Sequence, residues 1–162
     1  MTIDKGAIGP ALGRLPSGLA VATARHGSER TGFLASWIQQ LGFEPPLVGV
    51  CVKAGRPIGG LIEAGGGFAL NLLAEDDAPA LKRYGRGFEP GVDPWAADPE
   101  ALLAGLEQPV LASGFAYLLL RHVRTLEPGG DHLLYVGEVT GGGLLRPEAR
   151  PWVHLRKDGF GY

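Results

Sequence analysis

The stretch from Thr31 to Pro46 constrains the fold of this chain most strongly, because it ends in two consecutive prolines. Pro45 and Pro46 lack amide donors and have a fixed φ, so they cannot lie inside a central strand. Residues 32–38 are predicted to form a strand, and the apolar run Leu47–Val52 has the length of another. Between these two strands the pattern predicts a polar, glycine-containing loop at one edge of a sheet.

The loop and the residues beyond it carry groups that suit a polar ring with an anionic tail. Ser36, Gln39 and Gln40 provide a hydroxyl and two amides, which pair with the carbonyls and nitrogens of a heterocycle. Lys53 and Arg56 follow the second strand, and such cations bind phosphate groups. Solvated surface charges are the commoner fate of lysine and arginine, so both interpretations of this pair stay open.

The glycines and the remaining apolar runs favour an all-β fold. Glycine accounts for 27 of the 162 residues, well above the average of roughly 7%, and it is spread among apolar runs as in proteins with many tight turns. Further strands are predicted at 19–24, 68–73, 115–126, 132–139 and 152–154, turns at 129–130 and 141–143, and short helices at 8–15, 57–64, 79–84 and 99–106. Six or seven strands with few helices favour a closed antiparallel barrel over an α/β fold, although periodicity alone does not separate a barrel from a sandwich.

Length, charge and cysteine content exclude several classes of protein. The 162 residues suit a single domain over 1–162, and a net charge of −2 argues against nucleic acid or an anionic membrane as partner. Cys51 is the single cysteine, so an internal disulfide and a multi-cysteine metal site are excluded, and a buried, inert thiol is expected. Without a signal pattern or an apolar run of roughly 20 residues, a cytoplasmic location is expected.

Several segments resemble one known family. Leu34, Ala35, Ser36 and Trp37, followed by Gln40 and by residues 43–46, resemble the flavin-contacting segment of flavin reductase-like proteins, the FMN-binding split-barrel family. Segments that match in the same order are 8–19, 68–72, 88–93, 130–132 and 153–157. The resemblance is closest to the C-terminal flavin reductase module of diflavin flavodiiron proteins, and it covers the chain from about Ile8 to Tyr162. It implies a mainly β, six-stranded antiparallel Greek-key split barrel with a few short helices, paired as a homodimer.

The resemblance also implies roles for residues in the central stretch. It places a flavin ring against the backbone of Leu34, Ala35, Ser36 and Trp37, with Gln39 and Gln40 as further cofactor-binding residues. Lys53 and Arg56 would then bind the flavin phosphate. Gly42 departs from the family pattern, in which a serine commonly stands two residues before the acidic-Pro-Pro sequence. Gln39 or a backbone N–H would have to replace that hydroxyl.

Outside the central stretch, the resemblance implies cofactor contacts at Asn71 and Arg86 and a catalytic position at His132. Asn71 interrupts an apolar strand, so its amide bonds either the backbone or a ligand. Arg86, with Phe88, would cover the flavin or its phosphate, the alternative being a solvated loop charge. His132 is expected beside the ring where nicotinamide docks, in a positioning role, the alternative being a capped strand end.

The C-terminal residues His154, Arg156 and Lys157 resemble the family's His-His-Arg-Lys segment, with Leu155 in place of the second histidine. Phe160 and Tyr162 could stack on a ring or reach a neighbouring subunit. A frayed terminus is the alternative.

The function implied is an FMN-binding NAD(P)H:flavin oxidoreductase, with FAD as an alternative cofactor. It would deliver reduced flavin or electrons to a partner oxygenase or diiron protein. Two other functions stay open: an electron-transfer flavoprotein with tightly bound FMN and no NAD(P)H turnover, and a non-catalytic split-barrel module. The sequence has no dinucleotide-binding glycine motif and no metal-binding motif. NAD(P)H would therefore bind transiently, and no metal site is predicted.

Overall fold

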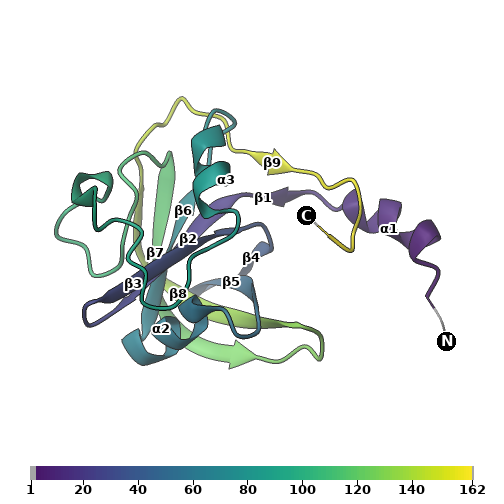
Figure 1. The fold of residues 1–162 in the computed structure, drawn as a ribbon, viewed down its shortest axis with the longest axis horizontal. Helices are drawn as coiled ribbons and strands as arrows, with labels where there is room; N and C mark the ends of the chain where they lie inside the picture. Colours follow the sequence, from purple (N-terminus) through teal and green to yellow (C-terminus); the bar gives the residue numbers. More distant parts are fainter. Residues whose placement is uncertain (1–2, 162) are drawn as a thin grey trace.

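The chain forms a seven-stranded antiparallel sheet with the strand order β3-β2-β6-β7-β8-β5-β4, here described from a computed structural model over residues 3–161 (Figure 1). The strands of this sheet are β2 (Ala20–His26), β3 (Glu29–Ala35), β4 (Ile38–Phe43), β5 (Pro46–Lys53), β6 (Gly67–Leu72), β7 (Ala116–Leu126) and β8 (His132–Leu144). A second, two-stranded sheet pairs β1 (Ser17–Gly18) with β9 (Val153–His154). The helices are α1 (Lys5–Gly13), α2 (Pro57–Gly65), α3 (Ala78–Tyr84) and the 3-10 turn η1 (Pro99–Ala101). None of these helices within residues 3–161 is long and apolar enough to cross a bilayer.

The sheet closes on itself at the point where β3 passes into β4. These two edge strands are consecutive in the chain and are joined by only Ser36 and Trp37. β3 also lies against β5, and the Cys51 N–H donates to the Trp37 carbonyl at 2.9 Å. The predicted antiparallel barrel with few short helices is confirmed, and its seam lies between β3 and β4.

The main sheet has one strand more than the six predicted, because the expected polar loop is itself a strand. Residues 38–43 pair with β5 from Ile38 opposite Val50 to Phe43 opposite Pro46, with a bulge between Gln40 and Gly42. Pro46 is tolerated because it is the first residue of β5, a position that need not donate a hydrogen bond to the neighbouring strand.

The predicted turn at 141–143 is also wrong, since these glycines lie inside β8 and pair with β7. A Cβ at Gly142 would stand 2.6 Å from the Tyr117 carbonyl oxygen, so only glycine fits there. The predicted helix at 99–106 shortens to the single turn η1.

Three apolar clusters lie within the described residues, and the two larger ones hold the barrel and its covering segments together. The larger one fills the barrel interior and includes Phe68, Leu70 and Val50, with Ile58 and Ile62 from the apolar face of α2, as predicted. The smaller one packs α3 and the segment that follows it onto the outer side of β2 and contains the fully buried Trp95. Its indole N–H donates to the Tyr84 hydroxyl at 2.9 Å.

Helix α1 extends from the barrel together with β1 and β9 (Figure 1). It begins earlier than predicted because the Asp4 carboxylate accepts hydrogen bonds from the Gly6 and Ala7 N–H groups and caps its first turn. Its buried positions are Gly9 and Gly13, which pack against the C-terminal segment. Of the predicted apolar face, Ile8 and Leu15 are exposed and Leu12 is half-buried, so this helix packs through Leu12 and its two buried glycines.

Candidate functional site

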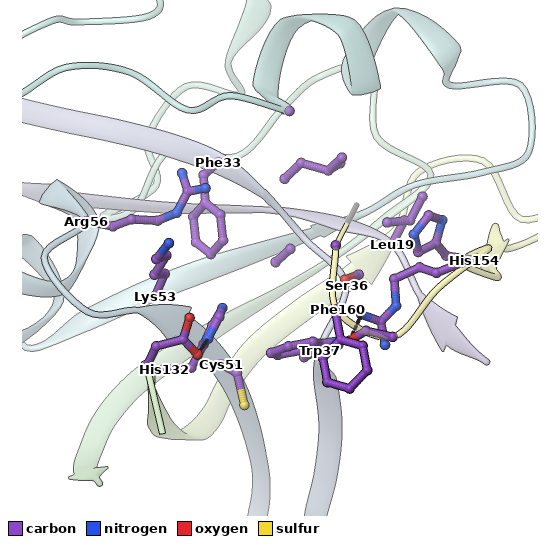
Figure 2. A pocket seen from close by; sticks show the side chains of 17 residues that line it. Leu19, Phe33, Ser36, Trp37, Cys51, Lys53, Arg56, His132, His154 and Phe160 are labelled. Carbon is purple, nitrogen blue, oxygen red and sulfur yellow. Dashed lines mark hydrogen bonds and ion pairs between the residues drawn. The ribbon is translucent and has the colours of Figure 1, made fainter. Parts of the chain in front are cut away.

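A cavity of about 560 Å³ opens at the seam between β3 and β4 (Figure 2). Its size falls within the roughly 300–1,000 Å³ of small-molecule sites. We call one side the barrel wall, formed by Leu19, Phe33, Leu34, Ala35, Ser36, Trp37, Cys51, Lys53, Arg56, Gly85, Asp131 and His132. We call the other side the tail wall, formed by His154, Arg156, Gly159, Phe160 and Gly161.

The end of β3 brings backbone donors and one unused hydroxyl to the cavity. β3 stands first in the strand order, so only one of its edges pairs with a strand and the other presents N–H and C=O groups. The Oγ atom of Ser36 is buried and has no hydrogen-bond partner within residues 3–161. Buried hydroxyls are almost always bonded in native proteins. The Ser36 hydroxyl is therefore available to a ligand or a water molecule in the cavity.

Two cations stand at one side of the cavity, where Figure 2 shows Lys53 and Arg56 together. The Arg56 guanidinium lies over the Phe33 ring at 5.1 Å, and its Nη1 donates to the Arg86 carbonyl at 3.4 Å. In the described part of the chain, no carboxylate lies within salt-bridge distance of either Lys53 or Arg56. Lys53 acts on the Asp131 carboxylate at longer range and helps to lower its pKa, but neither cation is held in a short ion pair with a described residue, so both can bind an anion such as a phosphate.

His132 is held at the start of β8 by its neighbour in sequence. Its Nδ1 lies 2.7 Å from the Asp131 carboxylate, and its ring lies 4.7 Å from the Trp37 ring. The hydrogen bond from His132 lowers the pKa of Asp131 below its usual value. In the neutral imidazole, an Nδ1–H that donates to Asp131 leaves Nε2 as an acceptor for a ligand.

The tail wall is an extended segment whose side chains alternate between the cavity and solvent. His154 and Arg156 line the cavity, while Val153 and Leu155 are 61% and 53% exposed. The Arg156 guanidinium lies over the Trp37 ring at 5.2 Å. Burial and the nearby Arg156 charge lower the pKa of His154, so its neutral form is favoured.

The structure brings together seven of the predicted site residues. They are Leu34, Ala35, Ser36, Trp37, Lys53, Arg56 and His132, and all of them line the cavity. Gln39 and Gln40 do not, because they lie on β4 with exposed side chains that donate to the carbonyls of Gln40 and Gly42. Arg86 contributes only its carbonyl, which accepts from Arg56.

Asn71 lies inside the protein and not at the cavity. Its side-chain N–H group donates to the Val21 carbonyl at 3.0 Å, and its oxygen accepts from the Leu111 N–H at 2.7 Å. The side chain is fully buried. The amide N–H group therefore links β6 to β2, the oxygen ties the segment before β7 to the barrel, and nothing in this geometry supports a contact with a ligand.

Several cavity residues have no assigned role in the sequence interpretation. Cys51 is half-buried at the cavity, unlike the fully buried thiol expected, because it faces away from the side of β5 that carries Val50 and Val52. Burial raises the pKa of its thiol, which disfavours the reactive thiolate.

Of the predicted tail residues, Phe160 lines the cavity, Lys157 is exposed, and Tyr162 lies outside the described residues. Within residues 3–161, no group of three His, Cys, Asp or Glu side chains could hold a metal ion.

Comparison with protein families and with curated proteins gives one consistent result. The model of the flavin reductase like domain matches residues 12–160. The chain is 35% identical to diflavin flavoprotein A 1 of Synechocystis sp. over 153 residues, which are 94% of this chain and 26% of that protein. The chain thus spans about a quarter of the length of the curated relatives it matches.

Solved structures resemble this chain over nearly its whole length. The NADH:FAD oxidoreductase SgcE6 of Streptomyces globisporus superposes with a TM-score of 0.78 at 28% identity, covering 90% of this chain and 86% of that one. Nitrilotriacetate monooxygenase component B from Mycobacterium thermoresistibile also gives a TM-score of 0.78, at 25% identity, covering 95% and 84% of the two chains. This chain therefore shares its fold with both proteins.

Proposed function

Because this chain belongs to the flavin reductase-like domain family, we propose that it is an NAD(P)H:flavin oxidoreductase that binds FMN in the seam cavity. One observation carries the proposal. The cavity combines an open strand edge with the Ser36 hydroxyl and two cations, none of which has a hydrogen-bond partner (Ser36) or an ion pair (Lys53, Arg56) among the described residues, and these are the partners required by a polar ring with a phosphate tail.

The donors of the barrel wall fit the separate parts of a flavin mononucleotide. Leu34, Ala35, Ser36 and Trp37 would hold the ring through backbone groups and the Ser36 hydroxyl. Lys53 and Arg56 would hold the phosphate, with Arg56 as a bidentate donor. FAD carries the same ring and a phosphate at the same place, so these residues accept either flavin.

In the proposed reaction, bound flavin supplies the acceptor for a hydride from NAD(P)H. The protein's own contribution is orientation and exclusion of water. His132, fixed by Asp131 and packed on Trp37, presents Nε2 to the cavity and would orient the nicotinamide carboxamide. No side chain needs to remove a proton in this step, so a positioning role suits His132 better than that of a general base.

We propose that reduced flavin, or its electrons, passes to a partner protein, and that the chain works as a homodimer. Two similarities support a separate acceptor: the matched part of a diflavin flavoprotein, and a structure named as one component of a monooxygenase. Exposed apolar side chains support self-association, including Phe43 at 90% exposure and Leu144 at 67%. The acceptor would be an oxygenase or a diiron protein.

The test combines flavin binding with anaerobic reduction. Purified protein is titrated with FMN and with riboflavin, which lacks the phosphate, and is then mixed with NADH or NADPH without oxygen. We expect binding of FMN and loss of visible flavin absorbance. Arg56→Gln should raise the Kd for FMN roughly 10- to 100-fold, as for a lost charge-assisted hydrogen bond, with little effect on riboflavin.

The matched control is Arg124→Gln, which removes an exposed arginine on β7 that is not part of the cavity. It should leave both affinities unchanged. Protein that binds no FMN refutes the proposal at the first step. Protein that binds FMN but is not reduced by NADH or NADPH is instead an electron-transfer flavoprotein.

A further inference from the structure

The cavity has two separate cationic sides, and flavin binding as proposed uses only one. Lys53 and Arg56 occupy one side, and Figure 2 shows His154 at the other, with Trp37 between the two sides. Arg156 belongs to this second side, where its guanidinium lies over the Trp37 ring. Within residues 3–161, Arg156 has no carboxylate at salt-bridge distance, whereas Arg30, Arg121 and Arg146 are all paired.

Arg156 is fixed in position by the backbone around it. Its N–H donates to the Gly13 carbonyl at 3.1 Å, and the Gly159 N–H donates to the Gly9 carbonyl at 2.8 Å. Two residues earlier, His154 pairs with Ser17 between β9 and β1. The Arg156 Nη1 also donates to the Gly159 carbonyl at 3.4 Å, so the guanidinium is held at the cavity without an ion pair to any described residue, and an anion meets a donor already in position.

Arg156 and His132 both contact Trp37, at 5.2 Å and 4.7 Å between group centres. The proposed nicotinamide position at His132 thus lies next to Arg156 along one continuous surface. A second anionic group beside Lys53 would be repelled by the flavin phosphate proposed to bind there. A separate cationic side at Arg156 keeps the two anions apart. His154, neutral because burial and Arg156 lower its pKa, adds a ring N–H donor beside the guanidinium.

We propose that Arg156, assisted by His154, binds the pyrophosphate of the reducing dinucleotide NAD(P)H while its nicotinamide lies at His132. This assignment rests on the proposed function and names the part of the chain that selects a dinucleotide over a simple hydride donor. Arg156 is a binding residue here and takes no part in hydride transfer.

FAD carries an adenosine pyrophosphate like that of NAD(P)H. The experiment therefore distinguishes binding of NAD(P)H at Arg156 from binding of FAD there. Wild-type protein and Arg156→Gln are compared with FMN bound, using NADH and 1-benzyl-1,4-dihydronicotinamide, a hydride donor without phosphate. The measured quantity is the ratio of kcat/KM for NADH to kcat/KM for the phosphate-free donor. In a second arm, the Kd values for FMN and FAD are measured for both proteins.

We expect the ratio to fall roughly 10- to 100-fold in Arg156→Gln, the range for loss of a charge-assisted hydrogen bond, through a higher KM for NADH at similar kcat. Arg156→Lys should recover part of the ratio, because a point charge replaces the planar donor. The matched control Lys157→Gln removes the same charge from the next residue, which is exposed and does not line the cavity, and should leave the ratio unchanged.

An unchanged ratio in Arg156→Gln, with an active wild-type protein, overturns this inference and leaves the proposed function intact. An unchanged ratio with a higher Kd for FAD but not for FMN also overturns it, and assigns Arg156 to the adenosine half of FAD. Wild-type protein that binds FMN but oxidises neither donor overturns both the inference and the proposed function.

Discussion

The barrel wall and the tail wall border the same cavity but are held in place by different interactions. The barrel wall belongs to a sheet whose inner side chains are buried, among them Phe33 at 6% exposure and Ala35 at 2%. Within residues 3–161, no residue of the tail wall belongs to a buried apolar cluster, and main-chain pairing attaches this wall to α1 and to β1. One wall is stabilised by burial of side chains, the other by close approach of backbones.

This difference predicts different modes of opening. The barrel wall can move only when the apolar core is disrupted, so its opening should require global unfolding. The tail wall can separate when a few main-chain hydrogen bonds break, which is a local event with a lower free energy. A site with one fixed and one looser wall can keep a cofactor while a second ligand enters and leaves.

The largest effect is expected from Phe68→Ala, which removes a fully buried ring from the barrel core. Truncation of a buried phenylalanine costs about 3–5 kcal/mol, and urea unfolding followed by circular dichroism measures this loss. The matched variant in the tail wall is Phe160→Ala, which removes a ring that is 47% exposed and should cost less than about 1 kcal/mol. Equal losses would show that the two walls form one cooperative unit.

A smaller and local effect is expected from Gly13→Ala. The added Cβ would lie 2.6 Å from the Arg156 carbonyl oxygen, so the tail must shift and lose hydrogen bonds worth roughly 1 kcal/mol each. Amide hydrogen exchange at Arg156 and Gly159 should accelerate, while exchange in β6 stays as in the wild type. Gly6→Ala is the control in the same helix, because its Cβ would meet only one Asp4 carboxylate oxygen, at 3.3 Å, and no atom of the tail. Unchanged exchange in Gly13→Ala would refute the glycine contact.

The smallest effect concerns pH and is confined to the tail wall. Burial, followed by the Arg156 charge, lowers the pKa of His154 from its usual 6.5. Between the lowered value and 6.5 the unfolded chain binds more protons, so stability should fall as the pH drops through this window. His154→Gln should reduce that loss in urea unfolding between pH 7.5 and about 5.5. In an NMR titration, Arg156→Gln should shift the His154 pKa upward, and a downward shift would contradict the assigned cause.

The sequence predicts the barrel wall well because its residues are close together in the chain. The strand pattern and the prolines locate the seam, and Ser36, Lys53 and Arg56 all lie within one short stretch that reaches the cavity. The error at residues 38–43 arises because a polar edge strand with a bulge has the same composition as a loop.

Other parts of the site depend on contacts that no local pattern reveals. A polar amide in an apolar strand has the same sequence signature whether it bonds a ligand or a loop, and Asn71 bonds the backbone on both sides. The order of the tail depends on glycines in α1 at the opposite end of the chain, so the alternative of a frayed terminus could not be excluded from sequence. The alternation of apolar Val153 and Leu155 with polar His154 and Arg156 indicates an extended segment but does not indicate which side faces a cavity.

In evolutionary terms, the contact between Gly13 and the Arg156 backbone joins two distant positions into one unit of selection. A Cβ at Gly159 would likewise fall 2.1 Å from the Leu12 Cβ, so position 159 is also restricted to glycine. Replacement of either glycine by a larger residue would therefore displace Arg156 although Arg156 itself is unchanged. Descendant sequences should therefore keep Gly13, Gly159 and Arg156 together or lose them together, even though a helix and a tail carry them.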